Sequence, residues 1–243
     1  MTEVEAIEAA TRRALVAEEA QIDGWWLRCN PDLPNRRPNS ATTPPDGRID
    51  PGVVGEIIGW FAARGRPPII RVLSTSDSRL EEHLTSKGWT TEAPTNVMVS
   101  HAIGGLSAER VRAFGGGDGV PDEFVRTRVA AGMTATAAHL VHESGRGMSA
   151  GYAIAPATGE TVAVGRTEMQ DAMVGVYDVV TMPGERRKGW GTDVVRGLLS
   201  WAVARGATSA FLQVEVSNEA AVGLYGKLGF EILYTYWYRR PPV

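Results

Sequence analysis

Residues 184–191 read GERRKGWG and place three consecutive cations among glycines. An amphipathic helical pattern is predicted to begin directly after this run, at Thr192. A helix N-terminus carries unpaired N–H groups and a partial positive charge, so it attracts anions. Glycine lets the backbone come close to an anion, and Arg186, Arg187 and Lys188 add full positive charges. The pattern indicates a cradle for a pyrophosphate, and a solvated polar turn is the alternative interpretation.

The loop differs from two common phosphate-binding fingerprints. It lacks the Gly-x-x-x-x-Gly-Lys-Ser/Thr order of the P-loop, and the two glycines after its cations, Gly189 and Gly191, have the wrong spacing for the dinucleotide fingerprint. A phosphate-binding module for nucleotides remains one of the competing hypotheses, to be tested by which ligand binds.

Two motifs resemble those of the GNAT superfamily of acyl-CoA-dependent N-acyltransferases. Arg186-x-x-Gly189-x-Gly191 matches the Arg/Gln-x-x-Gly-x-Gly/Ala motif of that superfamily, and Pro183 stands three residues before the arginine, where a proline is frequent. The segment LQVEVSNEAAVGLYGKLGF at 212–230 resembles its C-terminal signature. The resemblance covers about residues 149–239 well and implies acetyl-CoA as co-substrate.

The resemblance also implies a set of cofactor-binding residues. The end of the strand before the loop would pair with the pantetheine arm, and the loop would hold the pyrophosphate through its N–H groups. Asn218 would touch the cofactor arm, although an asparagine there also suits a helix N-cap. The implied residues are Val179, Val180, Thr181, Arg186, Arg187, Lys188, Gly189, Trp190, Gly191, Thr192, Asn218 and Tyr225.

Tyr225 matches the tyrosine that protonates the leaving thiolate in this superfamily. A phenol with an ordinary pKa near 10 is neutral at pH 7 and is able to donate a proton. The alternative role is an amphipathic core residue. The resemblance thus implies direct transfer, in which a neutral amine attacks the thioester carbonyl.

The base that would take the proton of the amine is less clearly marked. Gln213 stands where one branch of the superfamily often carries a glutamate, and glutamine is no base. Glu215 lies on the same face of its strand as Gln213, and Asp178 lies on the strand before the loop. We rank these two carboxylates together as candidate bases or amine anchors. Glu168, at a hairpin end, is expected to be solvated.

An internal repeat divides the chain into two halves. WFAARG at 60–65 and WAVARG at 201–206 share a pattern at an offset of 141 residues, and the register is kept downstream. Each copy is predicted to contain a helix, a strand, a helix, a Gly-aromatic pair and a strand. The predicted elements are 51–64, 68–73, 78–88 and 95–100 in the first copy, and 192–205, 210–216, 218–229 and 234–239 in the second.

The predicted fold is α/β, with a mixed, mostly antiparallel twisted sheet flanked by helices, in two related domains at 1–118 and 119–243. The boundary is placed in the Gly-rich stretch 104–123. The first half is interpreted as a degenerate GNAT-like domain, because the offset replaces its key residues. Tyr225 maps to Leu84, Asn218 to Asp77, Gly189 to Arg48 and Gly191 to Asp50.

Other expectations concern the flanks of the two copies. Residues 24–28 and 35–43 are predicted as early strands of the first half, 122–131 as a weak helix, and 137–143 as strand or helix. Arg36 and Arg37 are interpreted as a solvated turn in preference to an anion site. His139 and His142 are given no catalytic role.

Composition narrows the class of protein. A net charge of −3 does not indicate nucleic acid or an anionic membrane as partner, and a single cysteine, Cys29, builds neither an internal disulfide nor a cysteine-rich zinc site. We expect a cytoplasmic enzyme, monomeric or homodimeric, without a metal. Its acceptor would be the amine of a small molecule or a peptide. The competing hypothesis is a non-catalytic acyl-CoA sensor built from tandem GNAT folds.

Overall fold

The structure is a computed structural model that describes residues 1–45, 50–115, 119–134, 150–157 and 159–242. The predictions for 137–143, His139 and His142 therefore lie outside the described residues. The first half contains α1 (Glu3–Arg13), β1 (Glu18–Ile22), β2 (Trp25–Cys29), β3 (Ala41–Thr42), η1 (Pro51–Val53), α2 (Val54–Ala62), β4 (Ile70–Leu73), α3 (Ser78–Ser86), β5 (Thr90–Ser100) and β6 (Arg112–Gly115). The second half contains α4 (Asp122–Ala130), β7 (Ala150–Ala157), β8 (Glu160–Gln170), β9 (Met173–Thr181), η3 (Pro183–Glu185), α6 (Trp190–Val203), β10 (Ser209–Glu215), α7 (Glu219–Lys227) and β11 (Glu231–Arg240).

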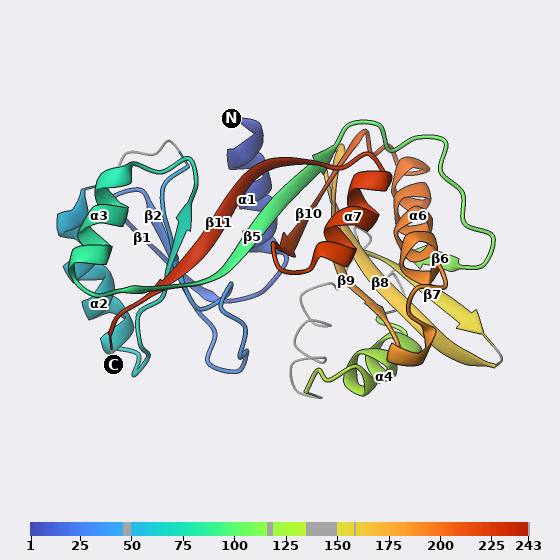
Figure 1. Cartoon of the computed structure of the whole chain (residues 1–243), viewed down its shortest axis with the longest axis horizontal. Coiled ribbons are helices and arrows are strands. Elements are labelled where there is room, and N and C mark those ends of the chain that lie inside the picture. The colour runs from blue at the N-terminus through green and yellow to red at the C-terminus, as the bar shows by residue number, and fades with distance from the viewer. Residues whose placement is uncertain (46–49, 116–118, 135–149, 158, 243) are drawn as a thin grey trace.

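The described strands form one continuous sheet of 11 strands in the order β1-β2-β3-β4-β11-β5-β10-β9-β8-β7-β6. Most neighbours are antiparallel, and the pairs β3–β4 and β9–β10 are parallel. The long strands β11 and β5 cross the middle of the molecule together (Figure 1). The sheet therefore has the predicted mixed, mostly antiparallel character.

The two halves repeat one topology and exchange their last strands. The offset of 141 carries Ser78–Ser86 onto Glu219–Lys227, so α3 and α7 correspond at both ends. Asp77 caps α3 and Asn218 caps α7 with their side-chain oxygens. β11 pairs with β4 and β5, while β5 pairs with β10, so each half supplies a strand beside the other half's sheet.

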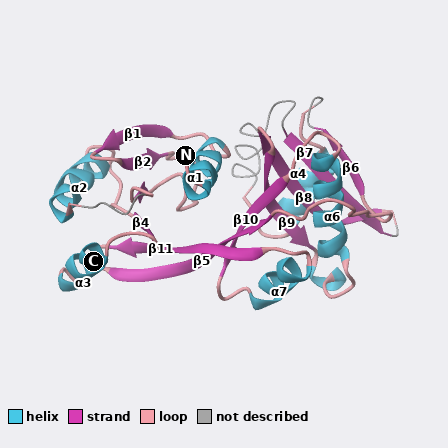
Figure 2. Ribbon diagram, turned by 90° about the horizontal axis from the view of Figure 1, so that it is seen from above, coloured by secondary structure: helices cyan, strands magenta, loops and turns pink. Residues whose placement is uncertain are grey.

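Helices cover both faces of this sheet. In the second half, α6 packs on Ala153 and Ala155 of β7, whereas Phe124 of α4 packs on Tyr152 and Ile154, which alternate with them. The capping box of Thr2 and Glu5 starts α1. This helix lies over the centre of the sheet, against residues of β4, β10 and β11 (Figure 2). One face thus carries α6 and α7, and the other carries α1 and α4.

The structure corrects several predicted boundaries. α6 begins at Trp190 and not at Thr192, so Gly191 lies inside its first turn. Of the predicted strand at 35–43, only Ala41–Thr42 pairs, because residues 36–40 form bends and turns. β1 and β6 were not predicted, and β6 turns part of the stretch interpreted as a linker into an edge strand paired with β7. The domain boundary near residue 118 stays a prediction.

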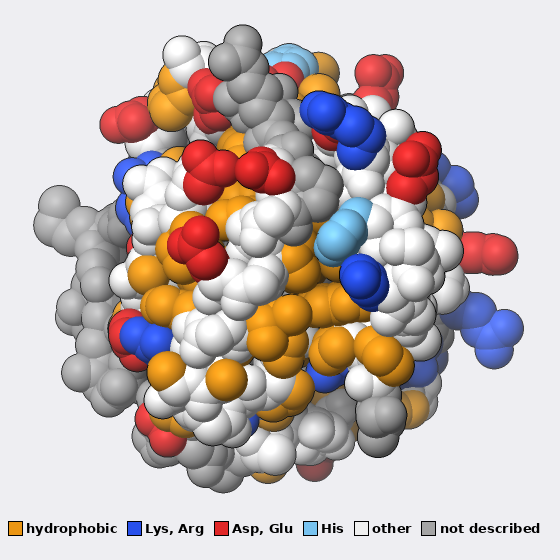
Figure 3. Space-filling view, turned by 90° about the vertical axis from the view of Figure 1, so that its left-hand side faces the viewer, with side chains coloured by type: hydrophobic (Ala, Val, Ile, Leu, Met, Phe, Trp, Pro, Cys, Tyr) orange, Lys and Arg blue, Asp and Glu red, His pale blue; other side chains and the backbone are white. Residues whose placement is uncertain are grey.

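The end of the molecule that carries α2 and α3 shows apolar side chains between scattered charges of both signs (Figure 3). This distribution agrees with the small net charge of −3. Among the described residues, no helix combines the length and the apolar character needed to cross a membrane.

Candidate active site

The site begins where β9 and β10 separate. Their parallel pairing covers Met173–Val176 against Ser209–Leu212 and ends there. Just beyond, the register of β8 against β9 shifts, and Asp178 has a φ of 55°. Such an irregularity bends a strand away from its neighbour. The two strands therefore open between the loop before α6 and the end of β10.

A pocket of about 1300 Å³ fills this opening and reaches both faces of the sheet. Its lining includes the start of α6 and the inner side of α7, on one face. It also includes the end of α1 and the turn before β3, on the other face. Residues that line it include Arg187, Gly189, Asn218 and Tyr225 on the first side, and Arg37, Tyr177, Gln213, Tyr236 and Tyr238 on the second.

The loop before α6 exposes a run of unpaired backbone donors. Arg187 has a φ of 63° and Gly189 has a φ of 87°, so the chain curls before the helix starts. Asp193 is the first residue of α6 whose N–H reaches an acceptor within this segment, the carbonyl of Gly189. Within the described structure, the N–H groups of residues 187–192 find no hydrogen-bond acceptor. A run of free donors at the start of a helix suits an anion, so these groups are the candidate for the cradle that the sequence predicts.

Arg110 holds this loop from outside, and sequence reasoning missed it. Its guanidinium forms an ion pair with Asp193, donates to the carbonyl of Lys188 at 3.4 Å, and lies 4.2 Å from the ring centroid of Trp190. A Cβ on Gly189 would lie 3.0 Å from Nη2 of Arg110. The only sequence signal for this clamp was an arginine in a stretch interpreted as a linker.

We expect the substitution Gly189→Ala to weaken binding of acetyl-CoA about 10-fold, because an L-residue in the left-handed region costs roughly 1–2 kcal/mol. The free loop would relax away from its present shape, and binding would have to restore it. Gly184→Ala is the matched control, since a Cβ there meets nothing within 4 Å. Calorimetric titration measures both variants. Equal affinities would show that the shape of the loop at Gly189 does not matter.

The side chains of the loop divide into two groups. Arg186 and Arg187 are exposed and line the pocket. Lys188 is bound by Glu185 at 2.8 Å, and the indole of Trp190 donates to the same carboxylate at 3.1 Å. The Lys188 side chain does not line the pocket, so its predicted part in cofactor binding would come from its backbone and its charge.

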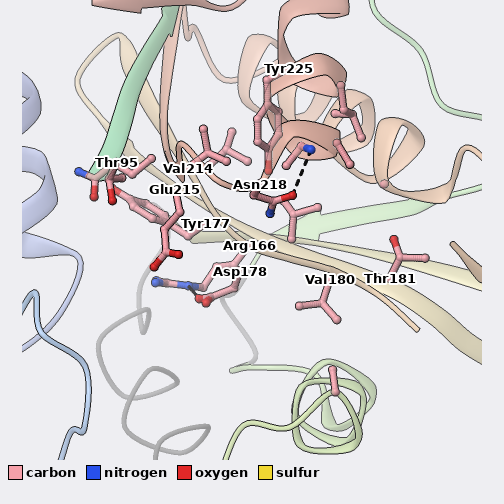
Figure 4. A pocket seen from close by; sticks show the side chains of 18 of the residues that line it. Thr95, Arg166, Tyr177, Asp178, Val180, Thr181, Val214, Glu215, Asn218 and Tyr225 are labelled. Atoms are coloured by element: carbon pink, nitrogen blue, oxygen red, sulfur yellow. Dashed lines mark hydrogen bonds and ion pairs between the residues drawn. The ribbon is translucent and has the colours of Figure 1, made fainter. Parts of the chain in front are cut away.

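Asn218 and Tyr225 stand on the same helix, facing the opening. Asn218 accepts the N–H of Ala221 at 3.2 Å, which gives it the predicted N-cap role, and its side chain also lines the pocket. Tyr225 points from α7 into the pocket (Figure 4). Its ring packs edge-on against Phe230, 6.1 Å between centroids. Burial raises the pKa of Tyr225 to about 12, so the phenol keeps its proton at neutral pH.

The two carboxylates ranked together differ in their surroundings. Asp178 accepts from Arg128 at 2.9 Å and from Arg166 at 3.2 Å, so its charge is already balanced. Glu215 keeps 54% of its side chain exposed, and its nearest cation is Arg36 at 4.0 Å. Its carboxylate points toward the region of Arg166 and Asp178 (Figure 4). The geometry favours Glu215 as the group that meets an incoming amine.

Glu168 is not the solvated carboxylate that the sequence led us to expect. Only 13% of its side chain is exposed, and burial raises its pKa despite Arg166 at 3.5 Å. It does not line the pocket. The hairpin end on which it was placed lies further on, since β8 runs to Gln170. Glu168 therefore lies within the strand and not at the exposed hairpin end.

Gln213 is built into the wall of the pocket. Its amide donates to the hydroxyl of Thr11 on α1 at 2.9 Å, and its carbonyl accepts from the hydroxyl of Tyr236 at 3.1 Å. A carboxylate here would have no proton to offer Thr11. The glutamine therefore fits a connecting role between α1 and β11, not that of a base.

Comparisons with known proteins identify the family and the fold. The family model described as "Probable histone acetyltransferase Rv0428c C-terminal" matches residues 1–239. The chain is 43% identical over 77 residues to the uncharacterized N-acetyltransferase YobR of Bacillus subtilis, a match that spans 32% of this chain and 31% of that relative.

Solved structures share the fold. A GCN5-related N-acetyltransferase from Kribbella flavida superposes with a TM-score of 0.72 at 18% identity, covering 100% of this chain and 97% of that one. A tandem GNAT protein from the clavulanic acid biosynthesis pathway gives a TM-score of 0.62 at 13% identity, covering 96% and 86%. The second match pairs this chain with a protein that also repeats the fold. The chain belongs to the Rv0428c C-terminal family and has the tandem fold of the GNAT superfamily.

Proposed function

We propose that this GNAT-family N-acetyltransferase moves an acetyl group from acetyl-CoA to an amine that enters from the α1 face of the sheet. One observation carries the proposal. The pocket joins the unpaired N–H groups on one face to a chamber on the other face. This chamber is the part of the pocket lined by Arg37, Tyr177, Glu215, Tyr236 and Tyr238. Such a pocket holds two reactants end to end across the opening between β9 and β10.

The residues of the first face suit acetyl-CoA. The N–H groups at the start of α6, with Arg186 and Arg187, would hold the pyrophosphate. The end of β9, at Val179 to Thr181, offers backbone groups to the pantetheine arm on the side where β10 has moved away. When bound, acetyl-CoA supplies a thioester, whose carbonyl carbon is the electrophile.

The residues around the opening suit proton transfer. Tyr225 holds a proton that it would donate to a thiolate leaving group. Glu215 is the accessible carboxylate that lines the chamber, and it would bind an ammonium group or take its proton, directly or through water. The acceptor would be a small molecule or a peptide, and the family description, which names histones, favours considering a peptide.

A titration and a turnover assay together test this function. We expect acetyl-CoA to bind in the calorimeter, and a library of amines to release free thiol in the presence of the protein. Binding without thiol release from any amine would favour the sensor hypothesis. Binding of a nucleotide in place of acetyl-CoA would contradict both.

A further inference from the structure

Arg37 lies at the α1 end of the pocket, in the turn between β2 and β3. The sequence suggested a solvated turn, but the structure buries its Nε, and no acceptor in the described part of the chain meets that atom. The groups that act most strongly on Arg37 are the phenols of Tyr236, Tyr238 and Tyr177, and another arginine, Arg71. Arg37 is half-buried and lines the pocket, and its guanidinium lacks the anion that charges removed from water normally have.

Other cations around the chamber are already paired. Arg36 is 2.9 Å from Glu92, which also binds Arg240. Arg71 forms a buried pair with Glu8, with N–O distances of 2.5 and 3.0 Å.

Arg166 is likewise paired, lying 3.2 Å from Asp178 and 3.5 Å from Glu168. Phenols with an ordinary pKa are neutral at neutral pH. Burial raises the pKa of Tyr177 and Tyr238, whereas the charges of Arg37 and Arg71 outweigh burial and lower the pKa of Tyr236. Arg37 therefore differs from Arg36, Arg71 and Arg166 in having phenols and one like charge as its main neighbours, and no carboxylate among the groups that act most strongly on it.

The position of Arg37 separates it from the phosphate cradle. The three tyrosines around it belong to the α1 face, in the cluster that contains Phe211. Leu212, the next residue of β10, points to the α6 face, where the cradle lies. An anion at Arg37 would thus belong to the second reactant. Glu215 lines the same pocket, and its largely exposed carboxylate is suited to an ammonium group.

We propose that the acceptor is an amine that carries its own carboxylate, as an amino acid does, and that Arg37 binds this carboxylate while Glu215 meets the amine. This inference rests on the proposed function and narrows its substrate. A guanidinium and a carboxylate form two parallel charge-assisted hydrogen bonds, which fixes both position and orientation. A lysine side chain in a basic peptide has no carboxylate to place there.

The test compares matched acceptors at saturating acetyl-CoA. The 20 protein amino acids are assayed beside their amides and their decarboxylated amines. We expect at least one amino acid to be acetylated with a kcat/KM about 10- to 100-fold above that of its amide, the range of one lost charged hydrogen-bonded pair. Equal rates for acid and amide, or turnover confined to amines without a carboxylate, would overturn the inference and leave the proposed function intact.

Variants locate the effect. Arg37→Gln should raise the KM for the amino acid about 10- to 100-fold, change the rate with the amide little, and leave the affinity for acetyl-CoA unchanged. Arg37→Lys should keep part of the preference. Arg64→Gln is the control, because Arg64 pairs with Glu18 and does not line the pocket. Loss of acetyl-CoA affinity in Arg37→Gln would instead assign Arg37 to a phosphate of the cofactor.

Two measurements are independent of turnover. Binding of the preferred amino acid to the protein without acetyl-CoA should raise the unfolding temperature of the wild type and not that of Arg37→Gln. If Arg37 serves the ligand, its removal alone should leave the unfolding temperature equal or higher, since an unbalanced buried charge is lost. A lower unfolding temperature, with no amino acid stabilising the wild type, would show a structural role and refute the inference.

Discussion

Tyr225→Phe should lower kcat for acetyl transfer by about 10²- to 10⁴-fold, the range expected when a positioned proton donor is removed. The phenylalanine ring keeps the edge-on contact with Phe230, because that contact uses no hydroxyl. The affinity for acetyl-CoA should therefore change little. A single-turnover assay, which follows acetyl transfer with enzyme in excess over acetyl-CoA, separates the chemical step from binding.

The pH dependence of this variant adds a second criterion. Burial raises the pKa of Tyr225 to about 12, so the donor stays protonated from neutral to strongly alkaline solution. The ratio of wild-type to variant kcat should then be constant from pH 7 to about pH 10, since both ends lie below that pKa. A ratio that falls over this range would mean that Tyr225 titrates earlier and that its surroundings in the complex differ.

Tyr152→Phe is the control. Burial raises the pKa of Tyr152 to about 12 as well, yet Tyr152 packs against Phe124 and does not line the pocket. Removal of the Tyr152 hydroxyl should leave kcat unchanged. An unchanged kcat in Tyr225→Phe itself would assign the proton to water and reduce Tyr225 to a packing residue.

Much of the fold could be predicted because its signals are local. The apolar pattern after the glycine-rich loop marked α6, and the repeat at an offset of 141 placed α3 and α7 in the same register. The strands β1 and β6 were not predicted, and the strand at 35–43 was predicted longer than β3, because their pairing depends on neighbours distant in the chain. The exchange of β5 and β11 between the two halves could not be predicted from the sequence for the same reason. β5 pairs with β10 and β11 of the second half, β11 pairs with β4 and β5 of the first half, and no local pattern records that choice.

The residues proposed for the cofactor side are easier to find in the sequence than those proposed for the acceptor side. The cradle lies in one continuous segment, so its glycines and cations could be interpreted together. The acceptor side joins Arg37, Glu215 and Tyr236 from three distant segments. Arg37 looked solvated because its burial comes from tyrosines about 200 residues away, on β11. Arg110 was missed for the same reason, since it lies 83 residues before Asp193 in the sequence and reaches it only in the folded chain.

Glu8→Gln should destabilise the protein by about 3–5 kcal/mol, because it leaves the charge of Arg71 buried without a partner. Glu8 and Arg71 are each 2% exposed, and Tyr234 also donates to the Glu8 carboxylate. These three residues lie on α1, β4 and β11. The pair therefore ties the N-terminal helix to both halves of the chain at the place where strands are exchanged. Denaturant unfolding at pH 7 measures the loss.

The pH dependence has a definite sign. Burial by itself would raise the pKa of Glu8, but the charge and hydrogen bonds of Arg71, with the hydroxyl of Tyr234, outweigh burial and hold the pKa below its ordinary value. A carboxylate with a depressed pKa in the folded state stabilises above its unfolded pKa and stops stabilising as the pH falls through the folded one. The advantage of the wild type over Glu8→Gln should therefore be full at neutral pH and shrink in acid.

Two further variants separate the ion pair from its context. Glu18→Gln breaks the exposed pair with Arg64, where water screens the charges, and should change the free energy of unfolding far less. The double variant Glu8→Leu, Arg71→Met removes both charges and should recover most of the loss, because neither partner is then stranded. If the double variant is as unstable as Glu8→Gln, the hydrogen bond to Tyr234 and the stacking of Arg71 on Tyr236, at 3.7 Å, hold this junction instead of the charge pair.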